Sequence, residues 1–246
     1  MAQKCGVDSA SRKRLSGRWD ARFAEVRRIS TMRVRWVAVA IGLSLAGCAP
    51  EVQRAALVPA YPEVKAGLAA PGTTLEKLVF RSPRARCHVF SNDALNGDHH
   101  LHFSPVRGTY RFDRVTGRAR LHMEIAMRNL EAEEHWIARF AGRMLAVDEF
   151  PKTVIDANLE PIDGQPEERD VKGNIVLRGV ERGIHFRAHV RDEADGVRFR
   201  AVFDMSRSAF GIRASAEEGD SLIRDDFTVT LEFHATREHV HVEEDP

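Results

Sequence analysis

Residues 184–191 read IHFRAHVR, an unbroken alternation of apolar and polar side chains. Strict alternation over four to eight residues is typical of a β-strand with one face buried and the other face in water. The pattern recurs, with small breaks, in four more segments: residues 123–127, 155–159, 197–203 and 227–233. The sequence therefore predicts an all-β domain.

The apolar faces of these strands must be covered by other parts of the chain. Residues 131–145 are the one stretch with the spacing of an amphipathic helix. A single short helix cannot cover so many strands, so their apolar faces must turn toward one another in a closed barrel or a sandwich. Turn pairs such as Asp195-Gly196 separate the segments at hairpin spacing, which favours antiparallel neighbours.

The charges of the chain are unevenly distributed. Ten Lys and Arg against three Asp and Glu give residues 1–47 a charge of +7, whereas the whole chain carries +1, so residues 48–246 carry −6. Binding to nucleic acid needs a surplus of cations on one face. The acidic body therefore argues against nucleic acid as a partner.

The basic head has the features of an export signal. Residues 32–35 read MRVR, an apolar run follows, and the chain then reads Leu45-Ala46-Gly47-Cys48. A basic start, about ten apolar residues and a break of small residues predict a secretory signal over 32–47. A helix of that length spans roughly 15 Å, half the hydrocarbon thickness of a bilayer. We expect residues 1–31 to be an extension upstream of the true start and outside the fold.

The four residues that end this signal resemble a bacterial lipobox, in which the cysteine is acylated and becomes the new N-terminus. The resemblance implies a lipid anchor on Cys48 and a location in the cell envelope. Ala49 after the cysteine implies sorting to the outer membrane, with the protein facing the periplasm. Residues 48–74 are rich in Ala and Pro and show no sustained period, so we expect a tether. Residues 238–246 form an acidic, histidine-containing tail.

Five segments resemble motifs of the YceI-like family, and they stand in the family's order. The segments are Val106–Phe112 (VRGTYRF), Leu145–Pro151 (LAVDEFP), Gly173–Val180 (GNIVLRGV), Ser206–Ile212 (SRSAFGI) and Ile223–Ala235. Val106–Phe112 resembles the family's early Gly-x-Phe strand. Ser206–Ile212 resembles its Arg-Ser-x-Phe-Gly-Ile motif, with Ala209 where the family usually has Asp or Glu.

The family resemblance implies the fold and a function. The expected fold is a lipocalin-like, closed antiparallel β-barrel over residues 75–237, with one short helix between strands. The expected function is binding of an apolar, lipid-like ligand of the polyisoprenoid type in the barrel lumen. A structural or stress-related envelope lipoprotein without a ligand, and a metal-binding protein, are the alternatives. The sequence does not determine the oligomeric state.

Seven side chains at the apolar, inward-facing positions of the last three predicted strands are expected to line the lumen. We expect them to provide bulk apolar contact, although the same side chains could instead fill a solid core. A tryptophan in place of Ala201 would then displace a ligand at little cost in stability. The expected lumen residues are Phe186, Phe199, Ala201, Phe203, Phe227, Leu231 and Phe233.

The sequence carries no signature of catalysis. It has no Gly-x-Ser-x-Gly elbow, no phosphate-binding glycine loop and no His-Glu-x-x-His helix, so we expect neither catalytic residues nor a cofactor. The pairs His100/His102 and His239/His241 each share one face of an extended chain and could share a metal. Zinc usually needs three or four protein ligands, so we expect no metal site. Cys87 and its neighbour His88 point to opposite faces of a strand, which disfavours a thiolate dyad.

Overall fold

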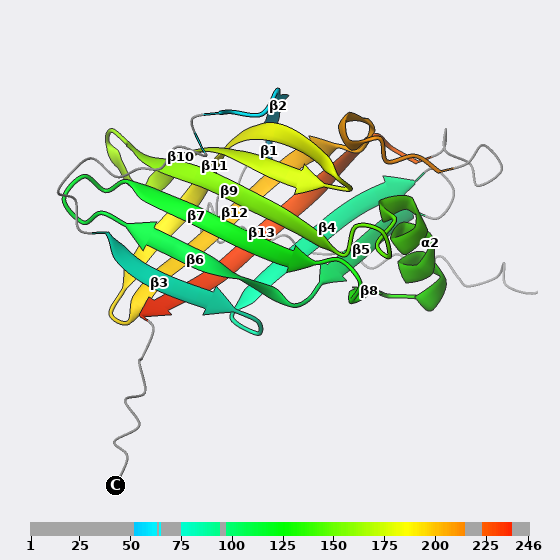
Figure 1. Ribbon diagram of the computed structural model, residues 1–246, viewed down its shortest axis with the longest axis horizontal. Coiled ribbons are helices and arrows are strands. Elements are labelled where there is room, and N and C mark those ends of the chain that lie inside the picture. Colours follow the sequence, from blue (N-terminus) through cyan, green and yellow to red (C-terminus); the bar gives the residue numbers. More distant parts are fainter. Residues whose placement is uncertain (1–51, 63, 65–74, 94–96, 215–222, 238–246) are drawn as a thin grey trace, which may run out of the picture. The chain divides into compact units, whose positions relative to one another are not determined.

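The computed structural model describes residues 52–62, 64, 75–93, 97–214 and 223–237, which are almost entirely β-structure (Figure 1). Eight of the described strands form a closed ring, and every neighbouring pair in the ring is antiparallel. The predicted closed antiparallel barrel is therefore confirmed. In ring order the strands are β3 (Glu76–Arg81), β6 (Val106–Phe112), β7 (Ala119–Ala126), β9 (Lys152–Ile162), β10 (Gln165–Leu177), β11 (Val180–Glu193), β12 (Gly196–Ser206) and β13 (Asp226–Arg237).

A second group of strands extends one end of the barrel. Strand β13 pairs with β3 at Thr236 and Arg237, and its residues 228–233 pair with β4 (Ala85–Asp93) instead. Strand β5 (Gly97–Phe103) pairs with β4, and the short β8 (Leu130–Ala132) pairs with β5. We call β4, β5 and β8 together the flap. The chain leaves β8 directly into the helix α2 (His135–Leu145), which lies beside the flap (Figure 1).

The helix is shorter at its start than the sequence predicted. Residues 130–132 pair with β5 as a strand, so the helix begins only at His135. Its end is fixed by Ala146, whose φ of 49° is left-handed. The Ala146 N–H donates to the carbonyl oxygen of Arg143, and the Val147 N–H donates to that of Gly142. These bonds satisfy carbonyl groups that have no partner inside the helix.

The prediction of a free tether over residues 48–74 is wrong for residues 53–58. Strands β11 and β12 pair directly only between residues 189–193 and 196–200. Where they separate, β1 (Gln53–Arg54) pairs with β12 and β2 (Ala56–Val58) pairs with β11. Open strand edges need hydrogen-bond partners, and this segment provides them. Strands of two and three residues are too short to show a period, so these two could not be predicted from the sequence.

The barrel interior is solid at the end away from α2. The ring of Phe233 stacks on Phe80 at a centroid distance of 4.0 Å and on Phe199 at 4.6 Å. Phe186 stacks on Phe203 at 4.1 Å, where the packed part of the interior meets the part nearer the helix. All five rings are at most 4% exposed. Close aromatic packing of this kind leaves no room for a ligand, so a binding site must lie nearer the helix.

Several predictions concern residues outside the described ranges. These are the extension at 1–31, the signal at 32–47, the lipid anchor at Cys48 and the tail at 238–246, and they stay predictions. Within the part of the chain that the structure describes, no helix has the length and apolar character needed to span a bilayer.

Candidate functional site

A cavity of about 240 Å³ lies between α2 and the interior of the barrel. The helix contributes its apolar side, of which Ile137 and Ala141 are buried. The barrel and the flap contribute inward-facing side chains such as Leu101, Ile155 and Leu231. The helix residues in the wall are Trp136, Ile137, Phe140, Ala141, Met144 and Leu145. An apolar cavity with few polar groups is the usual form of a small-molecule binding site.

The polar groups of the cavity wall are few, and most have partners in the protein. The hydroxyl of Thr153 donates to the sulfur of Met127 at 3.3 Å. The Arg207 guanidinium donates to the backbone oxygens of Ile212 and Ile223, each at 3.0 Å. His99 meets the ring of Trp136 edge-on at 6.3 Å. The wall therefore offers a ligand mainly apolar contact.

The seven predicted lumen residues divide between the cavity and the solid end. Phe203, Phe227 and Leu231 line the cavity. The other four are buried but are not part of its wall, because they belong to the close-packed part of the interior. These four are Phe186, Phe199, Ala201 and Phe233. Contact with a ligand in this cavity stays a prediction for the first three and is not supported for the other four.

Sequence reasoning missed the contribution of the helix and of the flap. The apolar side of residues 131–145 was visible in the sequence, and it now forms one wall of the cavity. The flap contributes Cys87, Val89 and Leu101 from two strands whose alternation is less regular. A helix whose apolar side covers the open end of a barrel was the signal that could have located the site.

Cys87 lines the cavity and is buried, whereas His88 lies on the outer face of the same strand. Burial away from water raises the pKa of the Cys87 thiol to about 12. Only a thiolate is an effective nucleophile, so this thiol is inert at neutral pH. Cys87 therefore contributes packing and a weakly polar surface, and no covalent chemistry.

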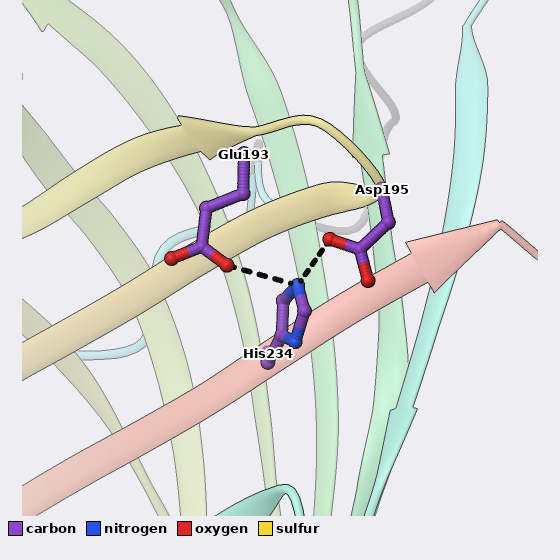
Figure 2. A group of neighbouring side chains, drawn as sticks. All are labelled: Glu193, Asp195 and His234. Carbon is purple, nitrogen blue, oxygen red and sulfur yellow. Dashed lines mark ion pairs between the residues drawn. The ribbon is translucent and has the colours of Figure 1, made fainter.

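Figure 2 shows a second group of side chains that could bind a ligand: Glu193 and Asp195 near the turn between β11 and β12, and His234 on β13. The His234 Nε2 lies 3.3 Å from the Glu193 carboxylate and 3.1 Å from that of Asp195. The ligand atoms of these three residues lie within 4.8 Å of one another, so the group could hold a metal ion as it stands. Arg198 already donates to Glu193 at 2.6 Å, and this bond holds the pKa of Glu193 below its usual value. A metal ion would have to compete with that guanidinium for the Glu193 carboxylate.

The comparisons with solved structures agree with the fold. The BcnA protein of Burkholderia cenocepacia superimposes with a TM-score of 0.55 at 15% identity, covering 62% of this chain and 96% of that one. A polyisoprenoid binding domain from Saccharophagus degradans, implicated in plant cell wall breakdown, gives 0.50 at 12% identity, covering 65% and 98%. No curated protein sequence matches the chain.

The family comparison is more specific than these structural similarities. The model of the YceI-like domain matches residues 86–235. This range runs from the second residue of β4 to Ala235 in β13, and it includes the strands between them and the helix over the cavity. The chain belongs to the YceI-like family.

Proposed function

We propose that this protein binds an apolar, lipid-like ligand in the cavity beneath α2. The observation that carries the proposal is a cavity of about 240 Å³ whose wall is almost entirely aliphatic and aromatic. Each ligand CH₂ that enters it gains about 0.8 kcal/mol by leaving water. The similarity to a polyisoprenoid binding domain supports the same class of ligand. The proposed activity is binding without catalysis.

The size of the cavity limits how much of a ligand it can hold. Pockets for drug-sized ligands usually measure about 300–1,000 Å³, more than the 240 Å³ found here. The cavity therefore suits a short chain or the end of a long one. A complete polyisoprenoid would need α2 to move away from the barrel. Such a movement would have to break the contacts of the buried Ile137 and Ala141 and of the partly buried Met144 and Leu145 with the core.

The proposal is tested by extracting the natively purified protein with organic solvent and analysing the extract by mass spectrometry. We expect one class of apolar molecule in near-stoichiometric amount, and its absence from a matched extract of the heat-denatured and washed protein. Octaprenol added to the extracted protein is expected to bind again in saturable fashion. An empty extract together with no uptake of octaprenol or of a C16 fatty acid would favour a structural envelope protein without a ligand.

We also propose that the protein is a lipoprotein of the envelope, anchored through Cys48 on the outer membrane. The lipobox-like residues before Cys48 support this proposal. The first strand, β1, begins at Gln53, five residues after Cys48. Five extended residues span at most about 18 Å. An acylated Cys48 would therefore hold the barrel close to the membrane surface.

Cys48→Ala is expected to abolish the incorporation of labelled fatty acid, because it removes the only thiol at the lipobox-like site. The variant should also leave the membrane fraction of cells. Cys87→Ala is the matched control, since Cys87 is the other cysteine downstream of Met32, and it should be labelled like the parent. Equal labelling of Cys48→Ala and of the parent protein would contradict the lipid anchor.

A further inference from the structure

Three histidines lie together on the outer face of the flap. His88 on β4 is the direct cross-strand partner of His102 on β5. His100 lies two residues before His102 on β5, so both side chains point to the same face of the sheet. That face is the outer one, because the alternate residues Cys87, Leu101 and Phe103 are buried.

The imidazole ring of His88 contacts both of the other rings. The Nε2 atom of His88 lies 3.0 Å from the Nδ1 atom of His100. The ring of His88 stacks on both neighbours, with centroid distances of 5.1 Å to His100 and 4.7 Å to His102. His88 and His100 are half-buried and His102 is exposed, so a solute ion can reach all three.

Two carboxylates from the next strand flank this group. Strand β8 pairs Glu131 directly with His102, on the side of β5 away from His88. Glu133 follows two residues later, and its Oε2 atom accepts a hydrogen bond from the backbone N–H of His100 at 3.3 Å. The flap therefore brings three imidazoles and two carboxylates to one small surface.

We propose that His88, His100 and His102 form a binding site for a divalent transition metal, with Zn²⁺ as the ion that the set fits best. Imidazole nitrogens are preferred ligands of zinc, and three of them with one carboxylate or water complete its usual four-coordinate shell. Two nitrogens bound to one tetrahedral zinc ion lie about 3.3 Å apart. The His88 and His100 nitrogens now share a hydrogen bond at 3.0 Å, a separation close to that value, and a bound zinc ion would take the place of the shared proton.

His102 completes the set after a rotation of its side chain. Its ring now lies face to face with His88, and it is exposed, so rotation about its side-chain bonds meets little resistance. Glu133 stands nearest to His100 and is the carboxylate placed to supply a fourth ligand. The sequence alone led us to expect no metal site, and this proposal replaces that expectation. The third ligand, His88, comes from β4, and the sequence does not show that β4 lies beside the His100/His102 pair on β5.

This site and the lipid cavity lie on opposite faces of the same two strands. Val89 and Leu101 pair with each other across β4 and β5 and face the cavity, next to the outward-facing His88 and His102. A metal ion on the outer face would clamp β4 to β5. It would thereby stiffen one wall of the cavity without contacting the ligand.

The test is a calorimetric titration of the full chain with zinc chloride, carried out in a His239→Ala, His241→Ala background so that the histidine pair of the tail cannot contribute. We expect one saturable site per chain. His100→Gln should weaken zinc binding at least tenfold, whereas His189→Gln, which changes an outward-facing histidine on β11, should leave it unchanged. Circular dichroism must show that both variants retain the parent's β-structure.

Cobalt supplies a readout that does not depend on heat. Co²⁺ bound in a four-coordinate site with nitrogen ligands absorbs visible light, and the band should be present in the parent background and lost in His100→Gln. Zinc should displace the cobalt band with the stoichiometry found by calorimetry. Absence of saturable binding, or binding that His100→Gln does not weaken, would overturn the proposal.

Discussion

Gly108→Ala is expected to lower the free energy of unfolding by about 3 kcal/mol or more, the upper range for overpacking a core. A Cβ atom on Gly108 would lie 2.0 Å from the carbonyl oxygen of His122 and 2.4 Å from the end of the Phe80 ring. The first atom is the backbone of the neighbouring strand, and the second belongs to a ring already stacked on Phe233. Neither can yield without disturbing the solid end of the barrel.

The matched control for this substitution is Gly142→Ala, which adds the same methyl group to the helix. A Cβ atom there meets only the Val147 side chain, at an ordinary 3.6 Å. Alanine favours a helix over glycine by about 0.5–1 kcal/mol, so this variant should be slightly more stable than the parent. Thermal unfolding should separate the two variants by about 10 °C. If the Gly108→Ala variant has the same melting temperature as the parent, the strands at this point are not close-packed.

The barrel could be predicted because alternation is a local property of each strand. Residues 184–191 alternate in the sequence, and in β11 they point alternately into the barrel and out of it. Alternation does not say which strands are neighbours. The pairing of β1 and β2 with β12 and β11, and of His88 with His102, depends on register between distant segments and could not be predicted.

The cavity was harder to predict than the fold for a related reason. The position of a residue in the alternation shows whether its side chain points inward, but not how far along the barrel axis the residue lies. Phe199 and Phe203 share one parity on β12, yet the first stacks on Phe233 in the solid end and the second lines the cavity. The difference arises from the strands that surround each position and from the helix that covers one end.

A pair of tryptophan substitutions is expected to separate the cavity from the solid core. Ala141 lies on α2 with its methyl group in the cavity wall. Ala201 lies on β12 one inward position further from the cavity than Phe203, and it is 2% exposed and paired with Leu231. The same change therefore places an indole in empty space at one position and in packed atoms at the other.

Ala141→Trp should remove ligand binding and leave the ligand-free protein about as stable as the parent. The indole would occupy much of a cavity of about 240 Å³, so the molecules extracted from the parent should be missing and added octaprenol should not bind. Ala201→Trp should instead cost roughly 1–3 kcal/mol, because the interior there has no space for it. This reverses the sequence-based expectation, which placed Ala201 against the ligand.

The two measurements are thermal unfolding of the solvent-extracted proteins and saturation binding of octaprenol to each of them. A fall of several degrees in melting temperature is expected for Ala201→Trp alone. Loss of binding is expected for Ala141→Trp alone, provided the Ala201 variant remains folded. If Ala141→Trp still binds octaprenol as the parent does, the ligand occupies another place on the barrel. If it is destabilised as much as Ala201→Trp, the space beneath the helix is already packed, and the cavity cannot be the binding site.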